Sequence, residues 1–254
     1  MNLHHVAAKG FATAAEAYEK GRPDYPRAAV ELLVTALRVG PGATVLDLGA
    51  GTGKLTRLLV PTGARVLALE PVEGMRRRLE QAVPGVAAMD GVAEDIPLPE
   101  AAVDAVVAGQ SFHWFHGDLA LPEIHRVLRP GGRLGLTWNA RDVRVDWVAQ
   151  VSAILDRHGR DAPRHRSGAW RRAFAESSLF RPVEERELDY QQQLDLDALL
   201  ERAASISYIS ALPLDERYAV LNEVRELVLR HPALAGQRLY TFPYRTLVAI
   251  FERT

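Results

Sequence analysis

The sequence contains no cysteine among its 254 residues. Disulfide bonds and thiolate-bound metals are therefore excluded, because both need the cysteine sulfur. We also see no group of acidic residues spaced to hold a divalent cation, so we expect no metal centre. Lysine is almost as rare, since it occurs only at positions 9, 20 and 54, and arginine supplies nearly all of the positive charge.

Net charge and long apolar runs are lacking as well. The formal net charge of −1 gives no overall attraction to nucleic acid or to an anionic membrane, and the arginine clusters at 76–78 and 164–172 are too local to change this. No apolar run reaches the roughly 18 residues of a membrane span. The start of the chain has no basic segment followed by an apolar one, so we expect no signal peptide. These absences predict a cytoplasmic protein that does not bind nucleic acid.

A regular alternation of short apolar strands with helical stretches runs through the chain. We predict strands at 44–49, 65–70, 86–89, 103–109 and 132–138, with helices at 53–60, 73–83 and 118–128. This alternation favours a parallel sheet with helices on both faces, and the uniformly apolar strands agree with burial on both sides. Beyond residue 139 we predict a helix at 146–157, an exposed arginine-rich loop at 159–172, a strand at 183–193, two helices within 195–231 and a final strand at 246–251.

The most informative segment is Val45-Leu-Asp-Leu-Gly-Ala-Gly-Thr-Gly-Lys-Leu55. An apolar run passes an acid, turns through three glycines and opens into a helix, and the next apolar run ends at Glu70. This layout is typical of a nucleoside-cofactor site at the carboxyl edge of a parallel sheet. A dinucleotide site needs a third glycine where this chain has Lys54, and Asp47 would repel a pyrophosphate. The same carboxylate suits the ammonium group of S-adenosylmethionine, whereas Glu70 can accept ribose hydroxyls of either cofactor.

This segment resembles the first motif of the class I S-adenosylmethionine-dependent methyltransferases. Three later segments follow in the order and spacing of that family, namely Gly91–Pro99, Val103–Gly109 and Val127–Leu134. The segments Phe11–Pro26 and Gln110–Phe115 look closer to its trans-aconitate-methyltransferase-like branch, a neighbour of the quinone-biosynthesis methyltransferases. The similarity covers about residues 11 to 140. It implies an α/β fold, a doubly wound and mostly parallel seven-stranded sheet whose seventh strand is antiparallel, with a helical insertion over the carboxyl edge.

The resemblance also implies a set of cofactor contacts. The glycine loop would approach the methionine part, Met75 would lie under the adenine unless it is ordinary core, and Gly109 with Gln110 would lie beside the sulfonium. Arg22 would pair with the cofactor carboxylate or with an acidic substrate. The complete set of expected cofactor residues is Tyr18, Arg22, Asp47, Gly49, Ala50, Gly51, Thr52, Gly53, Glu70, Pro71, Met75, Val92, Ala93, Glu94, Gly109 and Gln110.

The acceptor side has fewer motifs. His113 lies just past the fourth strand and is our candidate for a general base, with an ordinary packed histidine as the alternative. A base is needed only if the nucleophile carries a proton at pH 7, as a phenol or an enol does and a carboxylate does not. The residues that we expect to contact the acceptor are Tyr25, Trp138, Asn139, Arg141 and Tyr208.

We therefore predict a methyltransferase that converts S-adenosylmethionine to S-adenosylhomocysteine while methylating an oxygen or an activated carbon of a small molecule. There are two alternatives. The chain could bind the cofactor without transferring its methyl group, or it could be a nicotinamide-dependent oxidoreductase. We expect one structural domain with three functional parts. Residues 1–40 would form a helical lid, 41–140 the cofactor-binding core, and 141–254 the rest of the sheet with the acceptor-site helices at about 195–231.

Overall fold

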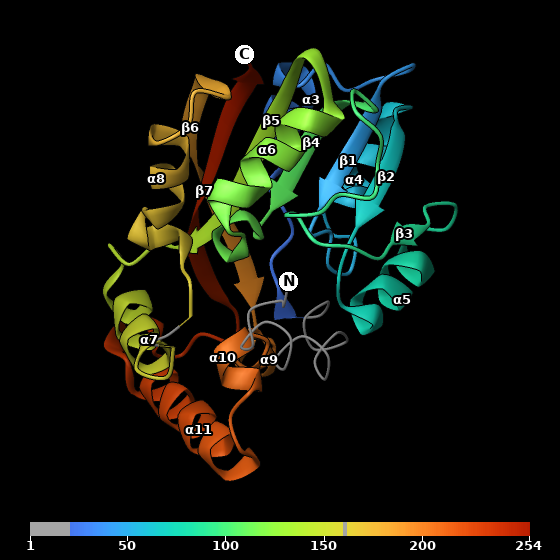
Figure 1. The fold of residues 1–254 in the computed structure, drawn as a ribbon. Coiled ribbons are helices and arrows are strands. Elements are labelled where there is room, and N and C mark those ends of the chain that lie inside the picture. The colour runs from blue at the N-terminus through green and yellow to red at the C-terminus, as the bar shows by residue number, and fades with distance from the viewer. Residues whose placement is uncertain (1–20, 160–161) are drawn as a thin grey trace.

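A seven-stranded sheet forms the centre of the molecule (Figure 1). The computed structural model describes residues 21–159 and 162–254. The strand order is β3-β2-β1-β4-β5-β7-β6, with β1 to β5 parallel and β7 antiparallel to both β5 and β6. This topology confirms the predicted α/β fold. The strands are β1 (Thr44–Leu48), β2 (Arg65–Leu69), β3 (Ala88–Met89), β4 (Val103–Gly109), β5 (Leu128–Arg141), β6 (Phe180–Leu194) and β7 (Tyr240–Arg253).

Helices cover both faces of the sheet. Alternate residues of β7 face opposite sides, since Val248 and Ile250 join one apolar cluster whereas Leu247 and Phe251 join another. The first cluster includes α3 and α4, and the second includes α6 and α8. The helices are α3 (Arg27–Ala36), α4 (Thr56–Leu59), α5 (Glu73–Ala82), α6 (Gly117–Val127), α7 (Asp146–Asp156), α8 (Ala169–Ala175), α9 (Leu196–Ala204), α10 (Ser207–Ser210) and α11 (Leu214–Arg230). Four short 3₁₀ turns are η1 (Val60–Thr62), η2 (Phe112–Trp114), η3 (His165–Ser167) and η4 (Pro232–Leu234).

A third apolar cluster lies beyond the carboxyl ends of the parallel strands. Helices α7, α9, α10 and α11 build it together with the start of β7, and Figure 1 shows them gathered at that end of the sheet. Three of these helices, α9 to α11, lie between β6 and β7 in the chain. The expected insertion at 195–231 is therefore present, with a short third helix, α10, between the two that were predicted.

Two local expectations were wrong. Residues 159–172 are not one exposed loop, because η3 and the start of α8 lie within them and Trp170 is 6% exposed, packed in the core. The predicted strand at 132–138 is too short, because β5 begins at Leu128 and includes residues 130–132, where its pairing with β4 shifts between Val103 and Ala105. Arginine density hid the first element, and a bulge hid the start of the second.

Within the described residues, no helix is both long enough and apolar enough to cross a membrane.

Candidate functional site

The loop after β1 has a backbone that only glycine adopts readily. Gly49, Gly51 and Gly53 have φ values of +68°, +58° and +85°. A Cβ on Gly49 would lie 2.7 Å from the Cβ of Ser111, so a side chain there would clash. A Cβ on Gly51 would meet no atom within 4 Å, so the backbone at this point borders open space. A Cβ on Gly53 would lie 2.9 Å from Leu79, so this glycine allows α5 to pack closely.

Two buried carboxylates lie beneath this loop. Asp47 is 1% exposed and accepts a hydrogen bond from the Thr56 hydroxyl at 2.7 Å. Burial, together with the negative charge of Glu70, raises the pKa of Asp47 to about 7. Glu70 is 6% exposed, and its two oxygens accept from the backbone N–H groups of Gly51 and Val72, each at 2.9 Å. Burial also raises the pKa of Glu70. Each of its oxygens keeps one lone pair that a hydroxyl could use.

A small cavity opens above these groups. Segment 22–25 forms its outer wall, and the Tyr25 hydroxyl packs so close to Gly109 that a Cβ there would lie 2.4 Å from it. Most of the predicted methionine-side residues are therefore brought together, whereas Tyr25, predicted to contact the acceptor, lies on the cofactor side. The lining residues are Arg22, Pro23, Tyr25, Asp47, Gly49, Ala50, Gly51, Thr52, Lys54, Leu55, Gly109 and Gln110.

The residues expected around an adenine follow β2 and β3. Pro71 follows Glu70 after the end of β2 and leads into α5, where Met75 is 2% exposed. Val92 and Asp95 form an isolated bridge around Ala93, which is buried. The Glu94 carboxylate accepts from the backbone N–H of His116 at 2.8 Å, at the start of α6. That side chain therefore has a structural partner, while Tyr18 lies outside the described residues.

Gln110 occupies a strained position at the end of β4. Its φ is +60°, a left-handed value that is uncommon for a residue with a side chain. Its backbone N–H donates to the carbonyl of Thr137 at 2.8 Å, and its amide donates to the carbonyl of Asn139 at 3.3 Å. Next to it, the Ser111 hydroxyl donates to the carbonyl of Leu48 at 2.8 Å. These bonds hold the ends of β1, β4 and β5 in one arrangement.

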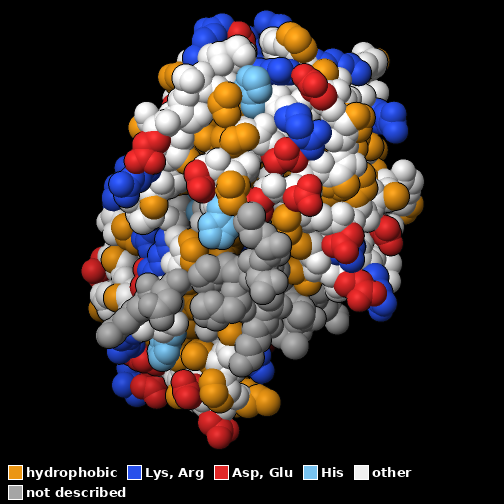
Figure 2. All heavy atoms as spheres, viewed as in Figure 1, with side chains coloured by type: hydrophobic (Ala, Val, Ile, Leu, Met, Phe, Trp, Pro, Cys, Tyr) orange, Lys and Arg blue, Asp and Glu red, His pale blue; other side chains and the backbone are white. Residues whose placement is uncertain are grey.

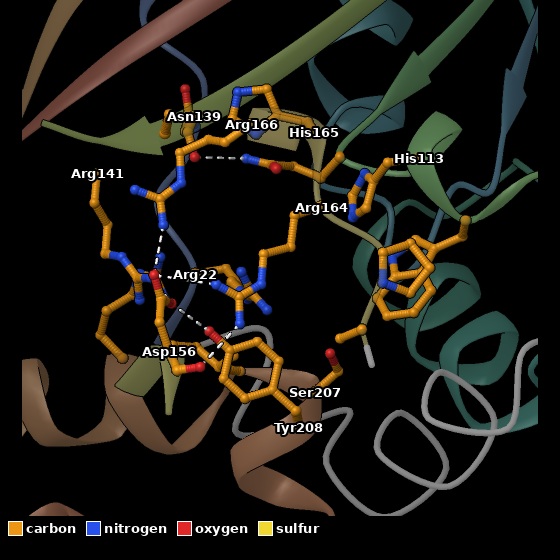
Figure 3. A pocket seen from close by; sticks show the side chains of 17 residues that line it. Arg22, His113, Asn139, Arg141, Asp156, Arg164, His165, Arg166, Ser207 and Tyr208 are labelled. Atoms are coloured by element: carbon orange, nitrogen blue, oxygen red, sulfur yellow. Dashed lines mark hydrogen bonds and ion pairs between the residues drawn. The ribbon is translucent and has the colours of Figure 1, made fainter. Parts of the chain in front are cut away.

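A second cavity, which we call the arginine cavity, lies between the end of β5, η3 and helices α7, α9 and α10 (Figure 3). Its volume is about 130 Å³, and it is partly open to solvent. Among the described residues that line it, the charged ones are five arginines and one aspartate: Arg22, Arg141, Arg164, Arg166, Arg202 and Asp156. The other lining residues are Gln110, His113, Trp114, Asn139, Ala140, Ala162, Pro163, His165, Ile206, Ser207 and Tyr208.

Asp156, the last residue of α7, connects several elements at one wall of this cavity. It pairs with Arg141 at 2.6 Å, with Arg164 at 3.1 Å and with Arg166 at 2.7 Å, and it accepts from the Tyr208 hydroxyl at 3.0 Å. Figure 3 shows these side chains converging on the carboxylate. Burial alone would raise the pKa of Asp156, but the three arginines outweigh it and the pKa is lowered.

His113 lies in η2, across the cavity from Arg141 in the view of Figure 3. Its Nδ1 accepts a hydrogen bond from the indole N–H of Trp138 at 3.1 Å. Burial, then the positive charges of His165 and Arg22, lower the pKa of His113 to about 3. The ring is therefore neutral at pH 7, and because the indole can only donate, the proton of the ring lies on Nε2.

The predicted acceptor residues divide into two groups. Asn139, Arg141 and Tyr208 line the arginine cavity. Trp138 is completely buried in β5, where its ring lies 4.8 Å from that of Trp170, and its indole N–H donates to His113. Sequence reasoning missed Asp156, Arg164, His165, Arg166 and Arg202. The one signal for them was the density of arginine near residue 165, which was assigned to a solvated loop.

Segment 22–25 joins the two cavities. Arg22 lines both of them and donates to the carbonyl of Ser205 at 3.4 Å. The carbonyl of Asp24 accepts from the Asn139 amide at 3.0 Å, while its carboxylate pairs with Arg57 at 2.6 Å and Lys54 at 3.1 Å. Gln110 also lines both cavities. The two cavities are therefore neighbours, with the side chains of Arg22 and Gln110 at their boundary.

Comparison with known proteins gives consistent matches. The family described as a methyltransferase domain matches residues 46–136. An uncharacterised methyltransferase of Mycobacterium tuberculosis is 42% identical over 237 residues, which cover 93% of each chain. A malonyl-[acyl-carrier protein] O-methyltransferase of Methylococcus capsulatus is 43% identical over 152 residues, covering 55% of this chain and 54% of that protein. The structure of a putative type II methyltransferase from Anaeromyxobacter dehalogenans superposes with a TM-score of 0.62, 29% identity and coverage of 91% and 96%.

Proposed function

We propose that this chain, which belongs to the class I S-adenosylmethionine-dependent methyltransferases, methylates a small anionic acceptor in the arginine cavity. The transfer of a methyl group from S-adenosylmethionine follows from membership in the family. The identity of the acceptor, its nucleophilic atom and the residues that bind it are the proposal. The observation that carries it is the meeting of two cavities at Arg22 and Gln110.

The residues of the first cavity fit the cofactor. Three left-handed glycines expose backbone, Asp47 places a carboxylate where an ammonium group can pair with it, and Glu70 retains lone pairs for hydroxyls. When bound, S-adenosylmethionine supplies a methyl group on a sulfonium that departs as a neutral thioether. The protein therefore needs mainly to align the acceptor and to exclude water. Arg22–Tyr25, a segment within the expected 1–40 lid, is suited to both tasks.

The charge of the arginine cavity favours an anionic acceptor. Five arginines face one aspartate there, although the whole chain carries a net charge of −1. On the molecular face seen in Figure 2, by contrast, basic and acidic side chains are interspersed. The excess of positive charge in the cavity therefore differs from the mixed charge of that face. Arginine matches oxyanions because its planar fork can donate two parallel hydrogen bonds.

His113 is poorly suited to remove a proton from the acceptor. Its acceptor nitrogen, Nδ1, already takes the Trp138 N–H, and its pKa of about 3 makes it a weak base. Its Nε2–H is instead a donor that can orient an oxygen. A carboxylate is already ionised at pH 7 and needs no base, so we propose a carboxylate oxygen as the nucleophile. The Methylococcus relative is an O-methyltransferase, which agrees with transfer to oxygen.

The proposal is tested by measuring S-adenosylhomocysteine formation with small carboxylates, phenols and enols. We expect turnover with a carboxylate, a methyl ester as product, and a maximal rate at saturating cofactor that stays flat between pH 5 and 8. His113→Ala should lower that rate less than about 10-fold, whereas loss of a positioned base costs roughly 10²-fold or more. Arg141→Met should weaken acceptor binding, and Arg225→Met, an exposed substitution on α11, is the control.

Two other outcomes would replace the proposal. A pH-dependent rate with a phenol, lost in His113→Ala, would restore His113 as a base. Cofactor binding without turnover on any acceptor would indicate a binding protein. Tight binding of a nicotinamide dinucleotide would instead favour an oxidoreductase.

A further inference from the structure

Among the residues that the structure describes, none gives the buried positive charge of Arg202 an acidic partner. It lies on α9, is 6% exposed and lines the arginine cavity. Within the described part of the chain, its Nε donates to the Tyr244 hydroxyl at 3.1 Å, and its Nη1 has no hydrogen-bond partner. Three other arginines of the cavity, at positions 141, 164 and 166, share Asp156 instead. Arg202 therefore differs from them in having a neutral partner alone.

The hydrogen bonds around Arg202 anchor one edge of its guanidinium. The Tyr244 hydroxyl donates to the side-chain oxygen of Gln192 at 3.1 Å, which leaves its own lone pair for the Nε of Arg202. Tyr244 is 1% exposed, so this chain of bonds is held inside the protein. The guanidinium is thus anchored at Nε while Nη1 is unused.

A buried and unpaired charge is unfavourable, because burial removes its hydration and nothing replaces it. A protein keeps such a group where a ligand completes it. The ligand that would complete a guanidinium is an oxyanion, because its oxygens match the N–H fork.

The position of Arg202 separates it from the point of transfer. Its partner Tyr244 pairs with Arg141 at the end of β5, whereas the Gln110 amide bonds to Asn139, two residues earlier on the same strand. Two strand residues correspond to roughly 7 Å. Arg202, on α9, and Gln110, at the end of β4, also line the cavity from different elements, so the two side chains can hold different groups of one acceptor.

We propose that Arg202 anchors a second anionic group of the acceptor, a group that is not itself methylated. This inference rests on the proposed function and narrows it to acceptors with two anionic ends, such as a dicarboxylate or an acid that also carries a phosphate. Arg202 sets the specificity, and the second anion positions the reacting carboxylate at the boundary with the cofactor cavity.

The test compares thermal unfolding of the wild-type chain and Arg202→Met in chloride, succinate or phosphate at matched ionic strength. In chloride we expect Arg202→Met to melt at a higher temperature than the wild type, because a buried unpaired charge has been replaced by an apolar chain of similar length. Succinate or phosphate should raise the melting temperature of the wild type and not that of the variant. A rise in melting temperature with succinate alone indicates that Arg202 binds a carboxylate of the acceptor. A rise with phosphate alone indicates that it binds a phosphate group.

Arg225→Met, on the exposed face of α11, is the matched control and should respond to anions as the wild type does. If Arg202→Met fails to fold, Arg202→Lys keeps the charge without the fork and should bind the same anion more weakly. An equal anion response in the wild type and the variant, or a lower melting temperature of Arg202→Met in chloride, would overturn the proposal.

These readings need no turnover, so failure of the anchor and failure of the proposed reaction can be told apart. Once an acceptor with two anionic ends turns over, Arg202→Met should raise its KM roughly 10- to 100-fold, the range expected for a lost charged hydrogen bond, with a smaller change in kcat. A KM equal to that of the wild type would remove Arg202 from acceptor recognition.

Discussion

Asp47 makes the stability of the cofactor-free protein depend on pH. Its pKa rises from the ordinary 3.8 to about 7 because it is buried and lies near Glu70. Between these two pH values the folded chain holds a proton that the unfolded chain has released. The stabilising contribution of this group is therefore present at low pH, and it is lost as the pH rises through about 7.

We predict that Asp47→Asn removes this dependence. At pH 8 the cofactor-free variant should be more stable than the wild type by a few kcal/mol, because no carboxylate has to ionise in the interior. At pH 5 the difference should be less than half as large, because the unfolded chain has then been ionised over only about one pH unit. Urea unfolding at both pH values measures this, and calorimetry should show that the variant binds S-adenosylmethionine much more weakly. A variant that loses stability equally at both pH values would contradict this account of Asp47.

Single residues could be predicted where their role depends on nearby sequence. The glycine loop and Asp47 lie within seven positions of one another, and the turn that they form is local, so the sequence was sufficient to locate them. Arg202 was not predictable in this way. The proposed role of Arg202 depends on its hydrogen bond to Tyr244, which is 42 positions away. It also depends on the absence of an acid in contact with Arg202 among the described residues.

At the scale of elements, Asp156 holds the strand β5, the turn η3 and the helix α10 to the end of α7. We predict that Asp156→Asn destabilises the fold by roughly 1–3 kcal/mol, because three arginines lose their common counter-charge. This is less than the roughly 3–5 kcal/mol of a fully buried pair, since 24% of the Asp156 side chain is exposed.

Urea unfolding gives the size of the effect, and hydrogen exchange over residues 162–168 should become faster because η3 is no longer held. The control is Glu223→Gln, which breaks the exposed pair between α11 and Arg157 and should cost less than about 1 kcal/mol. Similar losses in both variants would show that Asp156 is an ordinary surface partner.

The elements around Asp156 also show where sequence patterns failed. Strands and helices of the sheet were predicted because each has an apolar period that its own residues display. The turn η3 has no such apolar period. Arg164 and Arg166 are held instead by ion pairs with Asp156, a residue of α7. A dense group of arginines gives the same sequence pattern whether its side chains face solvent or pair with a carboxylate inside the fold.

For the whole molecule, the alternation of strands and helices was sufficient to predict a doubly wound sheet. The resemblance supplied the antiparallel last strand and the insertion between β6 and β7, both of which the structure confirms. Acceptor-site helices were expected there, but the arginine-rich lining of the cavity could not be predicted, because its walls come from segments more than 100 residues apart, such as Arg22 and Arg141.

Apart from residues near positions 22 and 110, which they share, the two cavities are lined by different stretches of the chain. Those of the cofactor cavity lie between positions 22 and 110, whereas four of the five arginines of the arginine cavity lie between positions 141 and 202. The two stretches can therefore diverge independently during evolution. Replacement of the later stretch by that of a relative should transplant a new acceptor preference onto an unchanged methyl-donor half, so that one ancestral scaffold can give rise to enzymes with many different substrates.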